Sequence, residues 1–141
     1  MTQTKNRSLQ VAAIMAITVL AFGTFQFASA EVKLEAQLEL AIDVNDGSGK
    51  AKYEERGDRI KASVEIEDME ADTTYTILVN GETVGVITTD ALGFGDVNLD
   101  SRNGADEFAL ANAIKENLDS NSDNLVEISL DGIVVLSGNL Q

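Results

Sequence analysis

The chain has 141 residues, of which 24 are acidic and ten are basic, and its formal net charge is −14. It contains no histidine, cysteine, proline or tryptophan. These absences exclude Ser-His-Asp and Cys-His catalysis, histidine zinc sites and disulfide bonds, so the fold must depend on hydrophobic burial and strand pairing. The acidity argues against nucleic acid and anionic membranes as partners.

The first 30 residues are typical of a cleavable secretory signal peptide. Two basic residues precede an uncharged stretch, residues 8–30, which has an apolar centre and closes with the small residues Ala28-Ser29-Ala30. We expect cleavage after Ala30 and export of a single domain, residues 31–141, to the extracellular space, the cell surface or the periplasm. An uncleaved membrane anchor is the alternative. Cleavage leaves eight basic residues against 24 acidic ones, a formal net charge of −16.

Apolar and polar residues alternate from Val32 to Ile42, which predicts a long first strand with one solvent-exposed face. The polar, glycine-bearing residues 43–49 end this strand. Donation of the strand to a neighbouring molecule, which would build fibres, is a further alternative.

The next two strands, Lys50–Arg56 and Arg59–Glu67, flank Gly57-Asp58, which predicts a hairpin with a two-residue turn. The register that this turn sets places Tyr53 opposite Ala62. It collects opposite charges on one face and apolar groups on the other, as a true pairing requires. The tripeptide Arg56-Gly57-Asp58 also occurs in integrin ligands, but the residue preferences of a two-residue hairpin turn explain it fully.

Two further hairpins are predicted at Asn80-Gly81 and Asp131-Gly132, because these dipeptides accept the positive φ angles of a type I′ turn. Their turns predict four cross-strand pairs: Ile77 with Val84, Tyr75 with Val86, Ile128 with Val135, and Leu130 with Ile133. The last hairpin makes the C-terminus part of the fold.

One further strand and one helix are expected between these hairpins. The strand is predicted over Gly95–Ser101, where Val97 and Leu99 alternate with polar residues. The helix is predicted over Ala105–Leu118, with Asn103 or Asp106 as its N-cap. Four apolar residues recur there at helical spacing: Phe108, Ala111, Ile114 and Leu118.

Eight hairpin-connected strands cannot bury their apolar faces as one flat sheet, so two packed sheets or a barrel must form. We predict a mainly β fold: an antiparallel β-sandwich of about eight strands with one inserted α-helix.

Residues 47–104, written GSGKAKYEERGDRIKASVEIEDMEADTTYTILVNGETVGVITTDALGFGDVNLDSRNG, carry four motifs in a fixed order. These are a Gly-x-Ala-x-Tyr strand, a charged hairpin, a Tyr-x-x-x-Val-Asn-Gly hairpin and a Gly-x-Gly strand. In this order the chain resembles small exported β-sandwich proteins of bacteria and archaea that have no assigned activity. The resemblance implies a surface or matrix module without a catalytic motif, and the helical insertion at Ala105–Leu118 departs from it.

The sequence offers two groups of metal-ligating residues with the alternate spacing of a calcium loop: Asp96, Asn98, Asp100 and Glu107, and Asp119, Asn121, Asp123 and Glu127. The first group is better explained as the exposed face of a strand whose buried face is Val97 and Leu99. The second group lies in a loop without apolar alternation, so it is the candidate calcium site.

The sequence identifies no catalytic residue and no required cofactor. The leading prediction is a non-catalytic exported module of the cell surface or extracellular matrix that binds a macromolecule or itself. One alternative is a calcium-dependent binding or assembly domain. The other is a hydrolase of extracellular polymers, which would need two carboxylates facing each other across a cleft.

Overall fold

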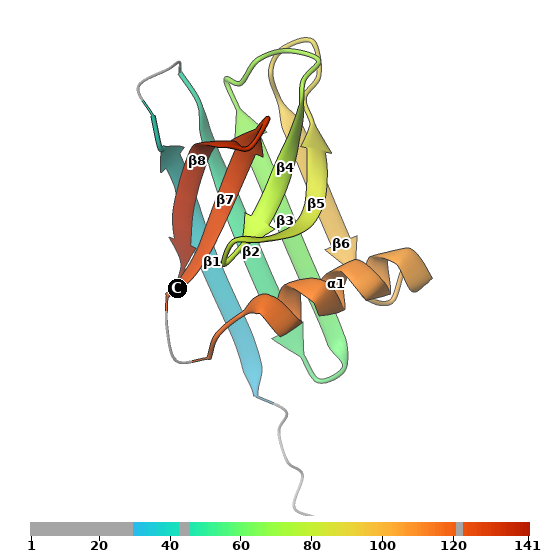
Figure 1. Cartoon of the computed structure of the whole chain (residues 1–141). Helices are drawn as coiled ribbons and strands as arrows, with labels where there is room; N and C mark the ends of the chain where they lie inside the picture. The colour runs from blue at the N-terminus through green and yellow to red at the C-terminus, as the bar shows by residue number, and fades with distance from the viewer. Residues whose placement is uncertain (1–29, 43–45, 121–122) are drawn as a thin grey trace, which may run out of the picture.

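The computed structural model of the chain describes residues 30–42, 46–120 and 123–141. In these ranges eight antiparallel strands and one helix follow one another (Figure 1): β1 (Glu31–Leu40), β2 (Ser48–Arg56), β3 (Arg59–Glu67), β4 (Thr74–Val79), β5 (Glu82–Thr88), β6 (Gly95–Asp100), α1 (Ala105–Asn117), β7 (Asn124–Leu130) and β8 (Ile133–Leu140). The predicted mainly β class with one inserted helix is therefore confirmed. Within the described ranges, no helix is long and apolar enough to cross a membrane.

The eight strands form one continuous sheet in the order β5-β4-β7-β8-β1-β2-β3-β6. The predicted two packed sheets are not observed, because this sheet curls into a partly open barrel (Figure 1). Strand β1 connects its two halves: Glu31–Leu38 pair with β2, while Glu39 and Leu40 pair with β8. Gly138 permits the close approach of β8, since an added Cβ there would lie 2.1 Å from the backbone oxygen of Gln37.

The interior of the barrel is filled by one side chain in two along most strands, as the alternation in the sequence predicts. The largest fully buried side chains are Leu38, Ile66, Ile87, Val126, Ile128 and Leu136. The predicted register of the first hairpin is confirmed along its whole length, and Tyr53 lies opposite Ala62.

The other two hairpins have the predicted turns but a different register. Asn80 and Asp131 both have φ 51°, and each is followed by a glycine with positive φ, as a type I′ turn requires. The pair Leu130–Ile133 is confirmed, whereas three predicted pairs are wrong by one residue, since the observed pairs are Ile77 with Gly85, Tyr75 with Ile87, and Ile128 with Leu136. A β-bulge at Val84 in β5 and another at Val135 in β8 cause the shift.

Helix α1 covers the barrel wall where the sheet is open, between β5 and β6, and it contacts β3, β5 and β6. Ala111 and Ile114 are buried there, and Leu110 lies over Gly85. The prediction that Phe108 belongs to the buried face is wrong, because its side chain is 53% exposed.

The N-terminus of α1 also differs from the prediction. The N-cap is Gly104, without a side-chain hydrogen bond, and not Asn103 or Asp106. Asn103 instead donates from Nδ2 to Glu107 Oε2 at 3.3 Å, and the backbone N–H of Asp100 donates to the same oxygen at 2.8 Å. Glu107 therefore ties the helix to the end of β6.

Candidate functional site

Most basic side chains of the described residues lie on one surface. Six of the eight follow the outward positions of three neighbouring strands: Lys33 on β1, Lys50, Lys52 and Arg56 on β2, and Arg59 and Lys61 on β3. We call the outward surface of β1, β2, β3 and β6 the charged face. It also carries acidic side chains, but the rest of the described chain has only Arg102 and Lys115 to balance its acids.

Strand pairing arranges the charged face in rows across the sheet. The three central rows are Lys33-Glu54-Lys61-Asp100, Glu35-Lys52-Ser63-Asn98 and Gln37-Lys50-Glu65-Asp96. The first row alternates in sign, which is favourable because directly opposite side chains on antiparallel strands lie close together. The second row ends in two short, uncharged side chains.

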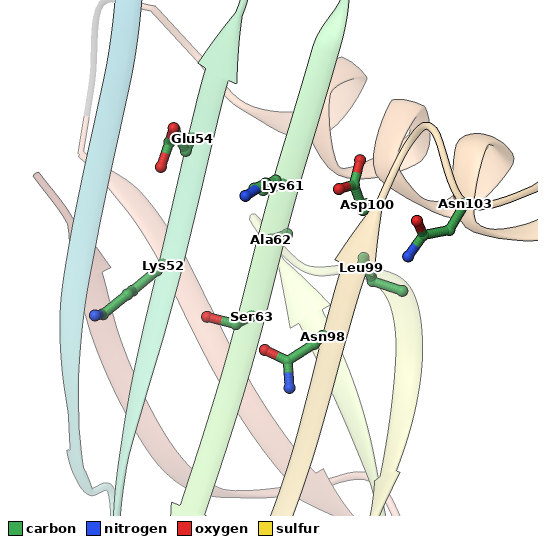
Figure 2. Close-up of a pocket in the computed structure, with 9 residues that line it drawn as sticks. All are labelled: Lys52, Glu54, Lys61, Ala62, Ser63, Asn98, Leu99, Asp100 and Asn103. Carbon is green, nitrogen blue, oxygen red and sulfur yellow. The ribbon is translucent and has the colours of Figure 1, made fainter.

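Because Ser63 is shorter than its neighbours Lys52, Lys61 and Glu65, the charged face is hollowed at this row. Figure 2 shows the hollow, which has a volume of about 320 Å³ and is lined by Lys52, Glu54, Lys61, Ser63, Asn98 and Asp100 among others. A second hollow of about 340 Å³ shares Lys52, Ser63 and Asn98 with it and extends to Lys50, Glu65 and Asp96. We call the two together the central groove.

One end of the central groove is fixed by Asp100. The Nε atom of Arg59 donates to both carboxylate oxygens of Asp100 at 3.1 Å, and Nη2 makes a further contact. This pairing, with the backbone N–H of Arg102, lowers the pKa of Asp100 to about 2. Asp100 is thus an anion held by the protein itself.

The first group of predicted metal ligands has other partners here. Asp96, Asn98 and Asp100 point outward from β6, as the strand interpretation predicts. Asn98 donates to Asp96 at 2.8 Å, Asp100 binds Arg59, and Glu107 accepts from the backbone of β6. These contacts explain the four side chains without a metal.

The second group is only partly visible. Asp119 and Asp123 are exposed on either side of residues 121–122, and Asn121 lies outside the described residues. Glu127 lies on β7, opposite Leu78 and Ser137. In the described part of the chain, no three acidic side chains come together as a metal site would require. The calcium site stays a prediction.

Sequence reasoning missed the central groove. The sequence does predict the two central strands of the groove, because the turn of the first hairpin places Lys50 opposite Glu65 and Glu54 opposite Lys61. The strands on either side, β1 and β6, are joined to this hairpin by tertiary pairing that no local pattern indicates.

Comparison with known proteins identifies no relative of the chain. No protein family matches it, and no curated sequence is significantly similar to it.

Proposed function

We propose that residues 31–141 form a non-catalytic exported module of the cell surface or extracellular matrix, which binds a macromolecule, or another copy of itself, through the charged face. The observation that carries the proposal is the central groove, where short polar side chains lie between rows of lysines and carboxylates. Such an alternation of donors and acceptors suits a polar polymer or protein surface, because complementary charges give specificity and fix the register of a partner.

The electrostatics of four carboxylates suit a binding role. Four carboxyl groups have a lowered pKa, each chiefly through a hydrogen bond from one cation: Glu31 with Lys33, Glu55 with Lys115, Asp58 with Arg102, and Asp100 with Arg59. A general acid needs a raised pKa. Carboxylates held ionised by lysine and arginine are suited to ion pairing.

The test is to fill the groove without changing its charge. Ser63→Tyr places a bulky side chain between Lys52 and Asn98, and Thr76→Tyr, on the outward face of β4, is the matched control because both residues are half-buried strand positions. Residues 31–141 and both variants are sedimented with washed cells of the producing organism and, alone, by analytical ultracentrifugation.

We expect the wild type and Thr76→Tyr to bind cells or to self-associate, and Ser63→Tyr to lose at least about ten-fold in affinity. Equal binding by all three proteins would rule out the charged face. Release of soluble sugar or peptide fragments from the cells would contradict a non-catalytic role. For the export step, the intact mass of the secreted protein should correspond to a chain that begins at Glu31.

A further inference from the structure

An apolar opening lies at the end of the barrel where β1, β3, β5 and β7 end. It differs in character from the central groove, which is polar and charged. Six of the side chains that line it are Leu40, Ile42, Tyr75, Leu130, Ile133 and Val135, and its volume is about 260 Å³. Leu40, Ile42 and Ile133 are exposed although they are large and aliphatic. We call this pocket the barrel mouth. Contiguous exposed apolar surface in a concave site is a common mark of ligand binding.

The rim of the barrel mouth is acidic. Asp46 and Glu70 line the pocket itself. The described loop residues at this end, 41–42, 46–47, 68–73, 89–94 and 131–132, contain six acidic side chains and no basic one: Asp46, Asp68, Glu70, Asp72, Asp90 and Asp131. Such a rim repels an anion such as a fatty acid and attracts a cation. It also opposes pairing of two copies mouth to mouth, since that contact would bring twelve carboxylates together.

One wall of the barrel mouth is held in place by the fold. The hydroxyl of Thr89 is buried and donates to the backbone oxygen of Glu70 at 2.6 Å, while the N–H of Glu70 donates to the Tyr75 hydroxyl at 3.2 Å. The N–H of Met69 donates to the oxygen of Gly93 at 3.1 Å. Gly93 has φ 78°, and a Cβ there would lie 2.1 Å from the Met69 oxygen. A wall that is already ordered loses little entropy when a ligand binds.

We propose that the barrel mouth binds an amphiphilic organic cation, with its aliphatic chain among Leu40, Tyr75 and Ile133 and its ammonium group beside Asp46 and Glu70. The volume sets the size of the ligand, because about 260 Å³ lies below the range of drug-sized sites and suits a short alkyl chain. The site is distinct from the charged face, which lies on the outside of the barrel, so the proposal does not depend on the function proposed above.

The test uses three ligands with the same chain: octyltrimethylammonium, octyl glucoside and octanoate, each below its micelle concentration. Calorimetry gives the affinities, and methyl NMR of the isoleucines locates the site. We expect shifts at Ile42 and Ile133, the tightest binding for the cation, and binding at least about ten-fold weaker for octanoate. Asp46→Asn with Glu70→Gln should reduce the affinity for the cation to about that for the glucoside.

Ile133→Ser tests the apolar part, and Val86→Ser is its matched control. Both side chains are 59% exposed on strands, so neither variant removes core packing. Ile133→Ser should weaken binding of the cation about five-fold, and Val86→Ser should leave it unchanged. Equal binding of octanoate and the cation, shifts confined to the charged face, or an unchanged affinity of Ile133→Ser would each overturn the proposal. So would a dimer that Ile133→Ser dissociates, because the mouth would then be an interface between copies.

Discussion

Asp100 is the acidic side chain whose titration the structure perturbs most clearly. Its side chain is 15% exposed, and its partner Arg59 is 40% exposed. The pKa of Asp100 in the folded protein is about 2, below its value of about 3.9 in an unfolded chain. Because the folded pKa is the lower one, the contribution of the pair to stability is complete above about pH 4 and is lost as the pH falls toward 2. The pair therefore makes the protein sensitive to acid.

We predict that Asp100→Asn is less stable than the wild type at pH 6 and that this difference shrinks as the pH falls from 4 to 2. Urea unfolding at several pH values measures it. Asp96→Asn is the control, since Asp96 lies on the same strand and accepts from Asn98, not from an arginine. A difference that stays constant with pH would contradict the assignment of the low pKa to the Arg59 pair.

Asn80 does more than form a turn. Its Nδ2 donates to the oxygen of Asn117 at 2.6 Å and to Asn124 Oδ1 at 3.0 Å, and its Oδ1 accepts from the N–H of Leu125 at 2.9 Å. Asp131 has the same φ of 51° in the equivalent turn. Asn80→Ala and Asp131→Ala therefore carry similar backbone strain, but only the first removes these hydrogen bonds. We predict that Asn80→Ala costs about 1–3 kcal/mol more in thermal or urea unfolding. Equal losses would show that the bonds add nothing.

At the scale of the elements, α1 acts as part of the barrel wall. Ile114 is buried beneath the helix, whereas Phe108 on the same helix is 53% exposed. We predict that Ile114→Ala lowers the free energy of unfolding by about 2–4 kcal/mol and that Phe108→Ala changes it by less than about 0.5 kcal/mol. Equilibrium unfolding in urea measures both. If Phe108→Ala costs as much as Ile114→Ala, Phe108 packs against the barrel as the sequence spacing predicted, which contradicts the observed exposure of its side chain.

The hairpins show which part of an element the sequence can predict. All three turns were predicted correctly, because glycine, asparagine and aspartate reveal the positive φ angles that a tight turn needs. The predicted register is wrong in two hairpins because Val84 and Val135 form β-bulges and have no partner in the pairing. Nothing in the sequence distinguishes a valine in a bulge from a valine in a regular pair. The consequence is visible in β5, where Ile87 faces the core and Val86 is exposed.

At the scale of the molecule, the local sequence pattern predicts the number of strands, but it does not predict that the sheet curls into a barrel. Each half of the sheet contains hairpins that the sequence predicts. The sequence does not predict that β1 joins the two halves, because that pairing connects Leu40 with Leu136, far apart in the chain. This pairing makes the sheet a barrel and so forms the barrel mouth, whereas the pairing of β1 with β2 gives the charged face its β1 edge. The long first strand lies between β8 and β2 of its own chain.

The charge of the whole molecule opposes its compact state. Residues 31–141 carry 24 acidic and eight basic side chains, and the ion pairs among the described residues lie mainly on the surface, where each contributes little. Salt weakens these pairs, but it also screens repulsion among the excess carboxylates. Because repulsion involves far more charges than the pairs do, we predict that sodium chloride raises the melting temperature of residues 31–141 at pH 7.

The same titration near pH 4 separates screening from other effects of salt. Many carboxyl groups are protonated at that pH, since their ordinary pKa values are about 3.9 to 4.3, so the repulsion largely disappears. The rise in melting temperature with sodium chloride should then flatten or reverse, because only the favourable pairs remain to be screened. An equal rise at both pH values would mean that salt acts through the hydrophobic effect, which does not depend on the charge of the protein. In that case, repulsion among the carboxylates at the acidic rim of the barrel mouth would not measurably lower the stability of the fold.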